Sequence, residues 1–243
     1  MRWVLVVSVV TGCGSAVRPG VSGPAAGPAA QADPPAIHWT RTAAEHRAVF
    51  LQTYQWAERR VQEVSSGLPA RAWAVILDAD ETVIDNSLYQ RERAAVGGAF
   101  TPETWTAWVR RREATALPGA AQFIARVRSL GGRVVIVTNR TQSECEDTRS
   151  NIQSLGIGVD LVLCRPAETS DKNPRFLAVQ NGTAAAGIPA LEVVMWIGDN
   201  IQDFPGLTQQ LAQAPDSSFA RFGGRYVVLP NPMYGSWERN PAR

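Results

Sequence analysis

Five short apolar runs set the strongest limit on how this chain can fold. They are rich in branched residues, and they end at Asp78, Thr138, Cys164, Asp199 and Pro230. Stretches of helical character separate them, around 119–130, 142–155, 172–186 and 201–213. A further helix is predicted over 42–64, where Thr42 and Glu45 have the spacing of a capping box. Buried strands alternating with helices are typical of a doubly wound, mainly parallel α/β sheet of the Rossmann-like kind.

The interval after the first run breaks this alternation, because it carries no strand pattern. Thr101-Pro102 has the form of a helix start, with proline at the first helical position, and Trp105 and Trp108 lie on the helix that follows. We interpret about residues 86–117 as a small helical cap inserted after the first strand.

The N-terminal segment is expected to serve export. Residues 1–12 combine one arginine, a short apolar run and small residues, which is the layout of a signal peptide, and the run before Cys13 resembles a bacterial lipobox. The alternative is a frayed apolar N-terminus at a misassigned start. Residues 13–36 are rich in Pro, Gly, Ala and Ser, which predicts a flexible tether before a folded domain over 37–243. We therefore expect a lipoprotein of the cell envelope, on the outer membrane or cell surface, with its membrane anchor at Cys13.

Composition restricts hydrolytic chemistry to carboxylates. The 24 basic and 22 acidic residues are mixed along the chain and give a net charge of +2, so no nucleic-acid polymer is expected as a partner. Two histidines, His38 and His46, are too few for a histidine-nucleophile phosphatase or a zinc site built from histidines. The sequence also has no P-loop and no G-x-S-x-G elbow.

Polar residues at the predicted strand ends form an ordered set. They are Asp78 and Asp80 after the first run, Thr138 and Asn139 at the second, Lys172 after the third, and Asp199 and Asp203 at the fourth. The ends of parallel strands meet at one edge of a sheet, so these side chains should share a cleft. Carboxylates that meet there would repel each other unless a hard cation lay between them, and an oxygen-only site suits Mg²⁺. Taken singly, each residue could be a helix cap, a strand residue or a surface lysine, but the ordered combination predicts phosphoryl transfer.

Several segments resemble a known family. The segments DADETVIDNS, VVIVTNR and IGDNIQDF, with the region of Lys172, resemble the four motifs of the haloacid dehalogenase (HAD) superfamily. TPETW, LPGA and LPNPMYGSWE are similar to class C acid phosphatases, bacterial surface lipoproteins also described as 5′-nucleotidases. The resemblance covers Trp39 to Glu238 and implies a magnesium-dependent acid phosphatase acting on phosphomonoesters, with 5′-nucleotides as its expected substrates.

The resemblance also assigns roles to the strand-end residues. Asp78 becomes the nucleophile that forms an aspartyl phosphate, and Asp80 becomes the general acid and base. Mg²⁺ would be held by Asp78, the backbone carbonyl of Asp80 and Asp199, with Asp203 as a further ligand or acting on metal-bound water. Phosphate would be bound by Thr138, Asn139 and Lys172.

Substrate choice and the cysteines are left open at this stage. Trp105, Tyr234 and Tyr89 are candidates for stacking on a nucleotide base, although Trp105 could instead pack a core. The alternatives to a nucleotidase are a phosphatase for another small phosphomonoester, such as a sugar phosphate or phosphoserine, and a ligand-binding surface lipoprotein with a vestigial site. Cys145 and Cys164 could form a disulfide or remain two separate buried thiols. The sequence gives no oligomeric state.

Overall fold

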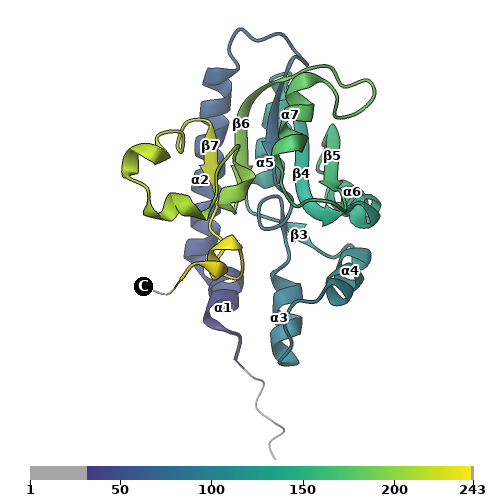
Figure 1. Cartoon of the computed structure of the whole chain (residues 1–243), viewed down its shortest axis with the longest axis vertical. Coiled ribbons are helices and arrows are strands. Elements are labelled where there is room, and N and C mark those ends of the chain that lie inside the picture. Colours follow the sequence, from purple (N-terminus) through teal and green to yellow (C-terminus); the bar gives the residue numbers. More distant parts are fainter. Residues whose placement is uncertain (1–31, 242–243) are drawn as a thin grey trace, which may run out of the picture. The chain divides into compact units, whose positions relative to one another are not determined.

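The computed structural model describes residues 32–241, and the predicted signal peptide and the lipidation site Cys13 lie outside them. A five-stranded sheet in the order β5-β4-β1-β6-β7 forms its centre (Figure 1). All neighbouring strands are parallel. The strands are β1 (Trp73–Leu77), β4 (Arg133–Thr141), β5 (Leu161–Arg165), β6 (Glu192–Gly198) and β7 (Tyr226–Val228). The chain winds outwards from β1 first to one side and then to the other, so the predicted doubly wound α/β fold is confirmed.

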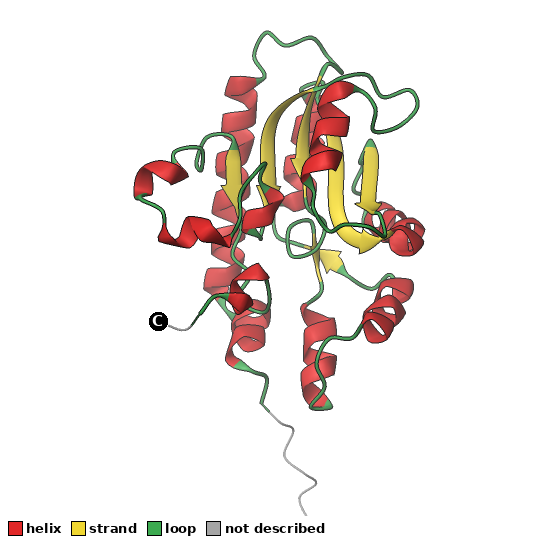
Figure 2. Ribbon diagram, viewed as in Figure 1, coloured by secondary structure: helices red, strands yellow, loops and turns green. Residues whose placement is uncertain are grey.

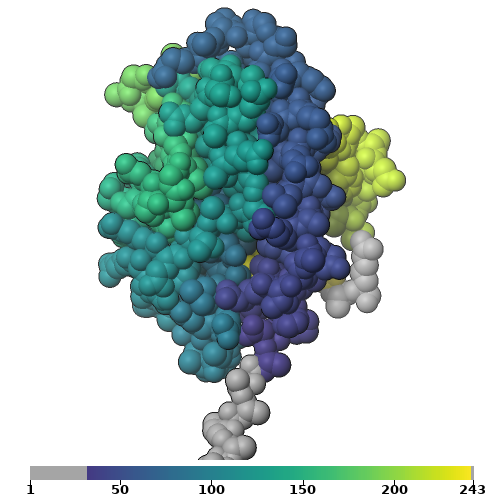
Figure 3. Space-filling model, turned by 180° about the vertical axis from the view of Figure 1, so that it is seen from behind, coloured from purple at the N-terminus to yellow at the C-terminus, as the bar shows by residue number. Residues whose placement is uncertain are grey.

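Helices cover both faces of this sheet. One face carries α2 (Ala44–Val64), α5 (Ala120–Ser129) and α6 (Cys145–Ser154), and the other carries α7 (Asn173–Asn181). The view from behind in Figure 3 shows the first of these faces, with α2 in purple to blue along its length. Successive residues of β1 supply the two cores: Val75 packs under α2 and α5, whereas Ile76 packs under α7. Because both sides of β1 are buried, the strand reads as a continuous apolar run.

Two predicted helices differ from the structure. The helix expected over 42–64 is present as α2 but begins two residues later, at Ala44, because Ala43 has an extended backbone and Thr42 ends a separate helix, α1 (Pro35–Thr42). Thr42 does not cap α2, since its hydroxyl donates to the His38 carbonyl inside α1 at 2.7 Å. Among the described residues the first helix, α1, begins at Pro35, two residues before the expected boundary at residue 37.

The helix expected over 201–213 is replaced by two 3₁₀ turns, η2 (Ile201–Asp203) and η3 (Gln209–Gln213). Pro205 explains the difference, because it lacks the N–H that a continuous helix would need at that point. The other 3₁₀ turns are η1 (Gln142–Glu144), η4 (Asp216–Phe219) and η5 (Ser236–Arg239). No helix between residues 32 and 241 is long and apolar enough to cross a membrane.

The segment inserted after β1 contains the helices α3 (Ser87–Ala95) and α4 (Pro102–Arg111). Thr101 caps α4 by accepting a hydrogen bond from the backbone of Thr104 at 3.2 Å, which agrees with the helix start expected there. A short antiparallel pair that the sequence did not predict, β2 (Ile84–Asp85) and β3 (Thr115–Ala116), joins the cap to the core. Figure 2 shows the cap helices beyond the arrowheads of the strands, so the cap lies at the end of the sheet where ligands bind.

A disulfide joins Cys145 at the start of α6 to Cys164 in β5. Their Cα atoms are 5.8 Å apart, within the range that a disulfide spans. Of the two alternatives left open by the sequence, the structure therefore has the bridge. It ties the start of α6 to the edge strand of the sheet, beside the end of β4.

Candidate active site

Three carboxylates gather where β1 and β6 end. Asp78 follows β1 and Asp199 follows β6, and these adjacent strands flank the point at which the winding of the sheet reverses. Asp203 joins them from the η2 turn, where its Oδ2 accepts a hydrogen bond from the Asn200 backbone at 2.9 Å. A Cβ at Gly198 would collide with Asp203, so glycine at the end of β6 gives this carboxylate its room. One ligand oxygen from each of the three acids lies within 4.8 Å of the others.

A single lysine pairs with this cluster. Lys172, directly before α7, donates from Nζ to Oδ1 of Asp78 and to Oδ1 of Asp203, both at 2.6 Å. Its side chain is only 4% exposed. When all three carboxylates are ionised, three negative charges face one ammonium and leave an excess of two. Buried charge without a partner is unfavourable, so the donor set fits a hard divalent cation.

Burial and the neighbouring charges also shift the pKa values of these acids and of Lys172. The pKa of the Asp78 carboxyl is raised to about 7, chiefly by burial and also by the charges of Asp203 and Asp80, against the opposing charge of Lys172. Burial also raises the pKa of Asp199 well above its ordinary value, with added repulsion from Asp203 and Asp78. Burial lowers the pKa of Lys172, but the two carboxylates it contacts more than offset this, so that it is raised overall. The cluster therefore has too little positive charge rather than too much.

Asp199 is held by two residues that the sequence interpretation missed. Its Oδ1 accepts a hydrogen bond from Thr82 at 3.3 Å, and its Oδ2 accepts one from Asn231 at 2.9 Å. The Asn231 side chain also accepts from the backbone N–H of Tyr234 at 3.4 Å, so it fastens the C-terminal loop to the site. No local pattern singles out Asn231, although it lies within the segment LPNPMYGSWE that carries part of the resemblance.

Asp80 lies in different surroundings although only one residue separates it from Asp78. Arg140 donates from Nη2 to Oδ1 at 2.7 Å and from Nε to both oxygens, at 3.0 and 3.2 Å. Asn86 donates to Oδ1 at 2.8 Å. The Oδ1 atom of Asn86 accepts in turn from the indole N–H of Trp108 in the cap, at 2.8 Å. Asp80 is thus held directly by the Arg140 cation and linked through Asn86 to the cap.

The two residues predicted at the end of the second run lie at the same edge of the sheet. Thr138 is buried, and its hydroxyl accepts from the backbone of Arg140 at 3.1 Å. Asn139 is exposed, and its side-chain oxygen accepts from Arg175 at 2.7 Å. Arg175, which the sequence interpretation also missed, donates to the carbonyls of Thr138 and Asp171 as well. It therefore fastens the end of β4 to the loop that carries Lys172.

The three aromatic candidates differ in how far a ligand could reach them. Tyr89 is 2% exposed, its hydroxyl pairs with Thr104 at 3.0 Å, and its ring meets Trp105 edge to face. A base could not stack on Tyr89 in this arrangement, so the structure contradicts that candidate. Trp105 is half-buried, with the Arg140 guanidinium 5.3 Å from its ring centre. Tyr234 is also half-buried, and its hydroxyl has no hydrogen-bond partner among the described residues.

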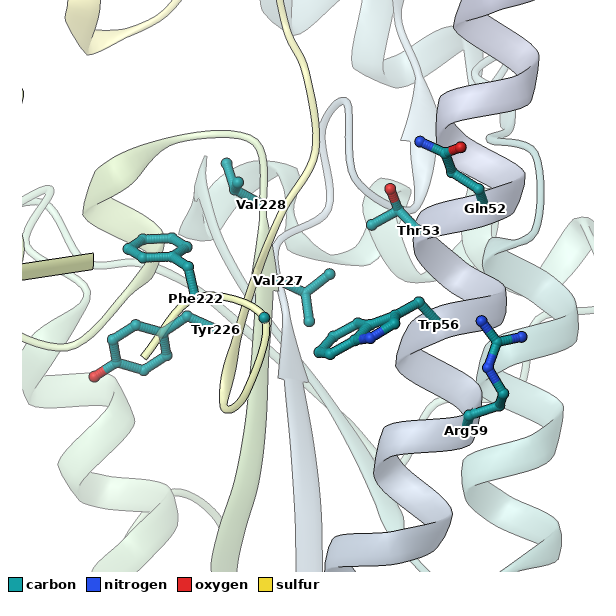
Figure 4. Close-up of a pocket in the computed structure, with 9 residues that line it drawn as sticks. Gln52, Thr53, Trp56, Arg59, Phe222, Tyr226, Val227 and Val228 are labelled. Atoms are coloured by element: carbon teal, nitrogen blue, oxygen red, sulfur yellow. The ribbon is translucent and has the colours of Figure 1, made fainter. Parts of the chain in front are cut away.

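A separate cavity of about 430 Å³ lies between α2 and β7. Trp56 and Arg59 of α2 line one side of it, and Phe222 and Tyr226 lie opposite (Figure 4). None of the acids described above lines this cavity, so it is not the site of the carboxylate chemistry.

Comparison with known proteins agrees with this geometry. Residues 24–237 match the family described as HAD superfamily, subfamily IIIB (acid phosphatase). The solved structure of the class C acid phosphatase from Bacillus anthracis is similar at 29% sequence identity, with a TM-score of 0.73 over 84% of this chain and 85% of that chain. A second structure of that phosphatase, with tungstate bound, matches to the same extent.

Proposed function

Because this chain belongs to the acid phosphatases of HAD subfamily IIIB and is therefore a phosphomonoester hydrolase, we propose that Asp78 is its nucleophile, Mg²⁺ its cofactor and 5′-nucleotides its substrates. The observation that carries this proposal is the buried contact of Asp78 with Lys172, beside Asp199 and Asp203. A nucleophile, a cation to hold phosphoryl oxygens and a metal-ligand set then meet at one point, which is what phosphoryl transfer requires.

The proposed reaction has two steps. A carboxylate oxygen of Asp78 forms a bond to phosphorus while the bond from phosphorus to the leaving alcohol breaks, and Asp80 gives its proton to that alcohol oxygen. Asp80 then takes a proton from the water that attacks the aspartyl phosphate, which releases phosphate and restores both acids. Because Asp80 has to begin protonated, we expect the enzyme to work best under acidic conditions.

Lys172 would hold the oxygens of the transferred phosphoryl group, with Thr138 and Asn139 beside it. Lys172 is already fixed by Asp78 and Asp203, so it needs little reorganisation when a phosphoryl group arrives. The Bacillus anthracis phosphatase has been solved with tungstate bound, and tungstate is a tetrahedral oxyanion like phosphate, which supports oxyanion binding by this chain.

The metal would be held by oxygens alone. We assign to it the carboxylates of Asp78, Asp199 and Asp203 and the backbone carbonyl of Asp80, an oxygen-only set with two excess negative charges that fits Mg²⁺. When bound, the cation supplies charge neutralisation for the phosphoryl oxygens.

Nucleotides are proposed because Trp105 and Tyr234 offer partly exposed aromatic rings in the cap and in the C-terminal loop. A sugar phosphate or phosphoserine could use the same acids, so these two regions decide between substrates. A vestigial ligand-binding site does not fit a chain that keeps the nucleophile, the neighbouring acid and the buried lysine together.

Export as a lipoprotein rests on the sequence of residues 1–13. If Cys13 carries lipid, Cys13→Ala should move the protein from the membrane fraction to the soluble fraction. Unchanged attachment would reject the anchor without affecting the catalytic proposal.

The test of the catalytic proposal is phosphate release from a substrate panel by the purified protein. The panel contains 5′-AMP, ribose 5-phosphate, phosphoserine and p-nitrophenyl phosphate, each assayed with Mg²⁺ and after exhaustive chelation. We expect turnover that depends on Mg²⁺ and is fastest with 5′-AMP. Full activity after chelation would reject the metal assignment, and a faster reaction with ribose 5-phosphate than with 5′-AMP would reject the nucleotide preference.

A further inference from the structure

The hydrogen bonds on Asp80 are distributed unequally between its two oxygens. Arg140 Nη2, Arg140 Nε and Asn86 Nδ2 all donate to Oδ1, at 2.7, 3.0 and 2.8 Å. Among the described residues, Oδ2 receives only the longer bond from Nε at 3.2 Å. Oδ1 is therefore saturated, whereas Oδ2 keeps the capacity to carry and transfer a proton.

Arg140 is itself fixed from three directions. It donates to Thr148 of α6 at 3.3 Å and to the side-chain oxygen of Asn86 at 3.1 Å. Its guanidinium lies over the ring of Trp105 in α4, at 5.3 Å. With its side chain only 1% exposed, Arg140 connects the core, the base of the cap and a cap helix to a single carboxylate.

We propose that Arg140 is the positioning residue of the general acid, and that Trp105 of the cap acts on catalysis by packing against Arg140. The planar fork of Arg140 holds Oδ1, which leaves Oδ2 of Asp80 for the leaving group. The orientation of the acid then depends on the position of the cap. This inference rests on the acid role proposed above for Asp80, and it gives Trp105 a function that needs no contact with a nucleotide base.

The experiment compares kcat/KM for two leaving groups in matched variants, because kcat/KM reports the step in which the leaving group departs, whereas hydrolysis of the aspartyl phosphate is common to both substrates. Ribose 5-phosphate releases a primary alcohol that needs a proton, whereas p-nitrophenolate departs with little help. For Arg140→Ala we expect a loss of about 100-fold with ribose 5-phosphate and less than about 10-fold with p-nitrophenyl phosphate, since general acid catalysis contributes about 10²–10⁴-fold. Guanidinium ion at low concentration should restore part of the loss, and Arg140→Lys should keep only part of the activity because it lacks the fork.

Arg111→Ala is the matched control. Arg111 also lies over a tryptophan of α4, at 4.7 Å from the ring of Trp108, but it pairs with the surface acids Glu92 and Glu113. We expect its kcat/KM values to stay within about twofold of wild type, because the helix keeps its core packing. Thermal unfolding of each variant shows whether it is folded; if Arg140→Ala is not, the comparison is made with Arg140→Lys.

Three results would overturn parts of this inference. Equal loss with both substrates and no effect of guanidinium would make Arg140 a structural residue. In Trp105→Ala, a loss with 5′-AMP but none with ribose 5-phosphate would make Trp105 a base clamp and not a partner of Arg140. If Asp80→Asn itself showed no dependence on the leaving group, the acid role in the proposed function would fail, and the contacts of Arg140 would be without catalytic meaning.

Discussion

Asp78 and Asp80 come from one D-x-D motif but lie in opposite electrostatic surroundings. Asp78 shares one lysine with Asp203 and lies close to Asp199, so the three carboxylates carry more negative charge than the lysine balances. Asp80 has an arginine of its own, with an amide beside it. The difference shows how two neighbouring acids acquire different tasks: environment, and not separation in sequence, separates a metal-binding nucleophile from a proton donor.

The two acids also differ in what holds them. The partners of Asp78 are placed by the end of β6 and the start of α7, both of which belong to the core. The partners of Asp80 extend through Arg140 and Asn86 to the tryptophans of the cap. Changes at Asp78 should therefore affect every substrate equally, whereas changes around Asp80 should depend on the leaving group.

The largest effect is expected for Asp78→Asn. The amide has the same size but no anionic oxygen to attack phosphorus, so kcat should fall by at least about 10⁴-fold with all substrates. The measurement is phosphate release from 5′-AMP and p-nitrophenyl phosphate, with Asp216→Asn as a control at an exposed aspartate. Substantial turnover by the Asp78 variant with either substrate would mean that another group is the nucleophile.

Asp80→Asn should give a smaller loss that differs between substrates. We expect about 10²–10⁴-fold with 5′-AMP, whose alcohol must be protonated, and a clearly smaller loss with p-nitrophenyl phosphate. The observable is the ratio of the two kcat/KM values in the variant and in the wild type, since kcat/KM reports the step in which the leaving group departs. An unchanged ratio would remove the distinction between the two acids.

This distinction could be predicted only in part from the sequence. The apolar runs fix the strands, and strand ends in a parallel sheet meet, so Asp78, Asp199 and Lys172 could be brought together from spacing alone. Arg140 and Asn231 could not be identified as their supports, because each acts across a long sequence separation on a partner that no periodicity reveals.

Individual residues explain where the predicted helices differ from the structure. Pro205 interrupts the segment expected to be helical, and the resulting turn directs Asp203 into the site. The capping-box spacing at Thr42 was misleading because an earlier helix already uses that residue as its last. The pairing of Cys145 with Cys164 depends on the register of β5 beside α6, which the sequence leaves open.

The charge excess around Asp78 can be tested through stability. The ordinary pKa of Asp78 is 3.8, and burial raises it to about 7 in the folded protein without metal. The folded state then holds its proton more tightly than the unfolded state, so this contribution to stability is present below pH 3.8 and is lost as the pH rises through about 7.

Mg²⁺ should reverse this loss, because it binds the ionised acids of the folded state. We expect Mg²⁺ to raise Tm more at pH 7.5 than at pH 5. In a domain of this size, each kcal/mol of added stability raises Tm by about 2–4 °C. Asp199→Asn should remove much of the gain, and calorimetry should show weaker Mg²⁺ binding. A gain in Tm that is equal at both pH values, or larger at pH 5, would contradict the charge argument.

The smallest effect is expected at Tyr234, which lies on neither side of the comparison but in the loop that Asn231 fastens to Asp199. If its ring stacks on a base, Tyr234→Ala should lower kcat/KM for 5′-AMP by about 5- to 150-fold, since stacking contributes about 1–3 kcal/mol per base. Ribose 5-phosphate also releases a primary sugar alcohol but has no base, so its kcat/KM should change by less than about twofold. Tyr234→Phe should behave like wild type, because the hydroxyl it removes has no hydrogen-bond partner among the described residues.

Trp237→Ala, at an exposed ring three residues further along the chain, serves as the control for a general disturbance of the loop. Equal losses with both phosphates in Tyr234→Ala would show that the ring supports Asn231 and the metal ligands instead of a base, and the choice of nucleotides would then depend on the cap.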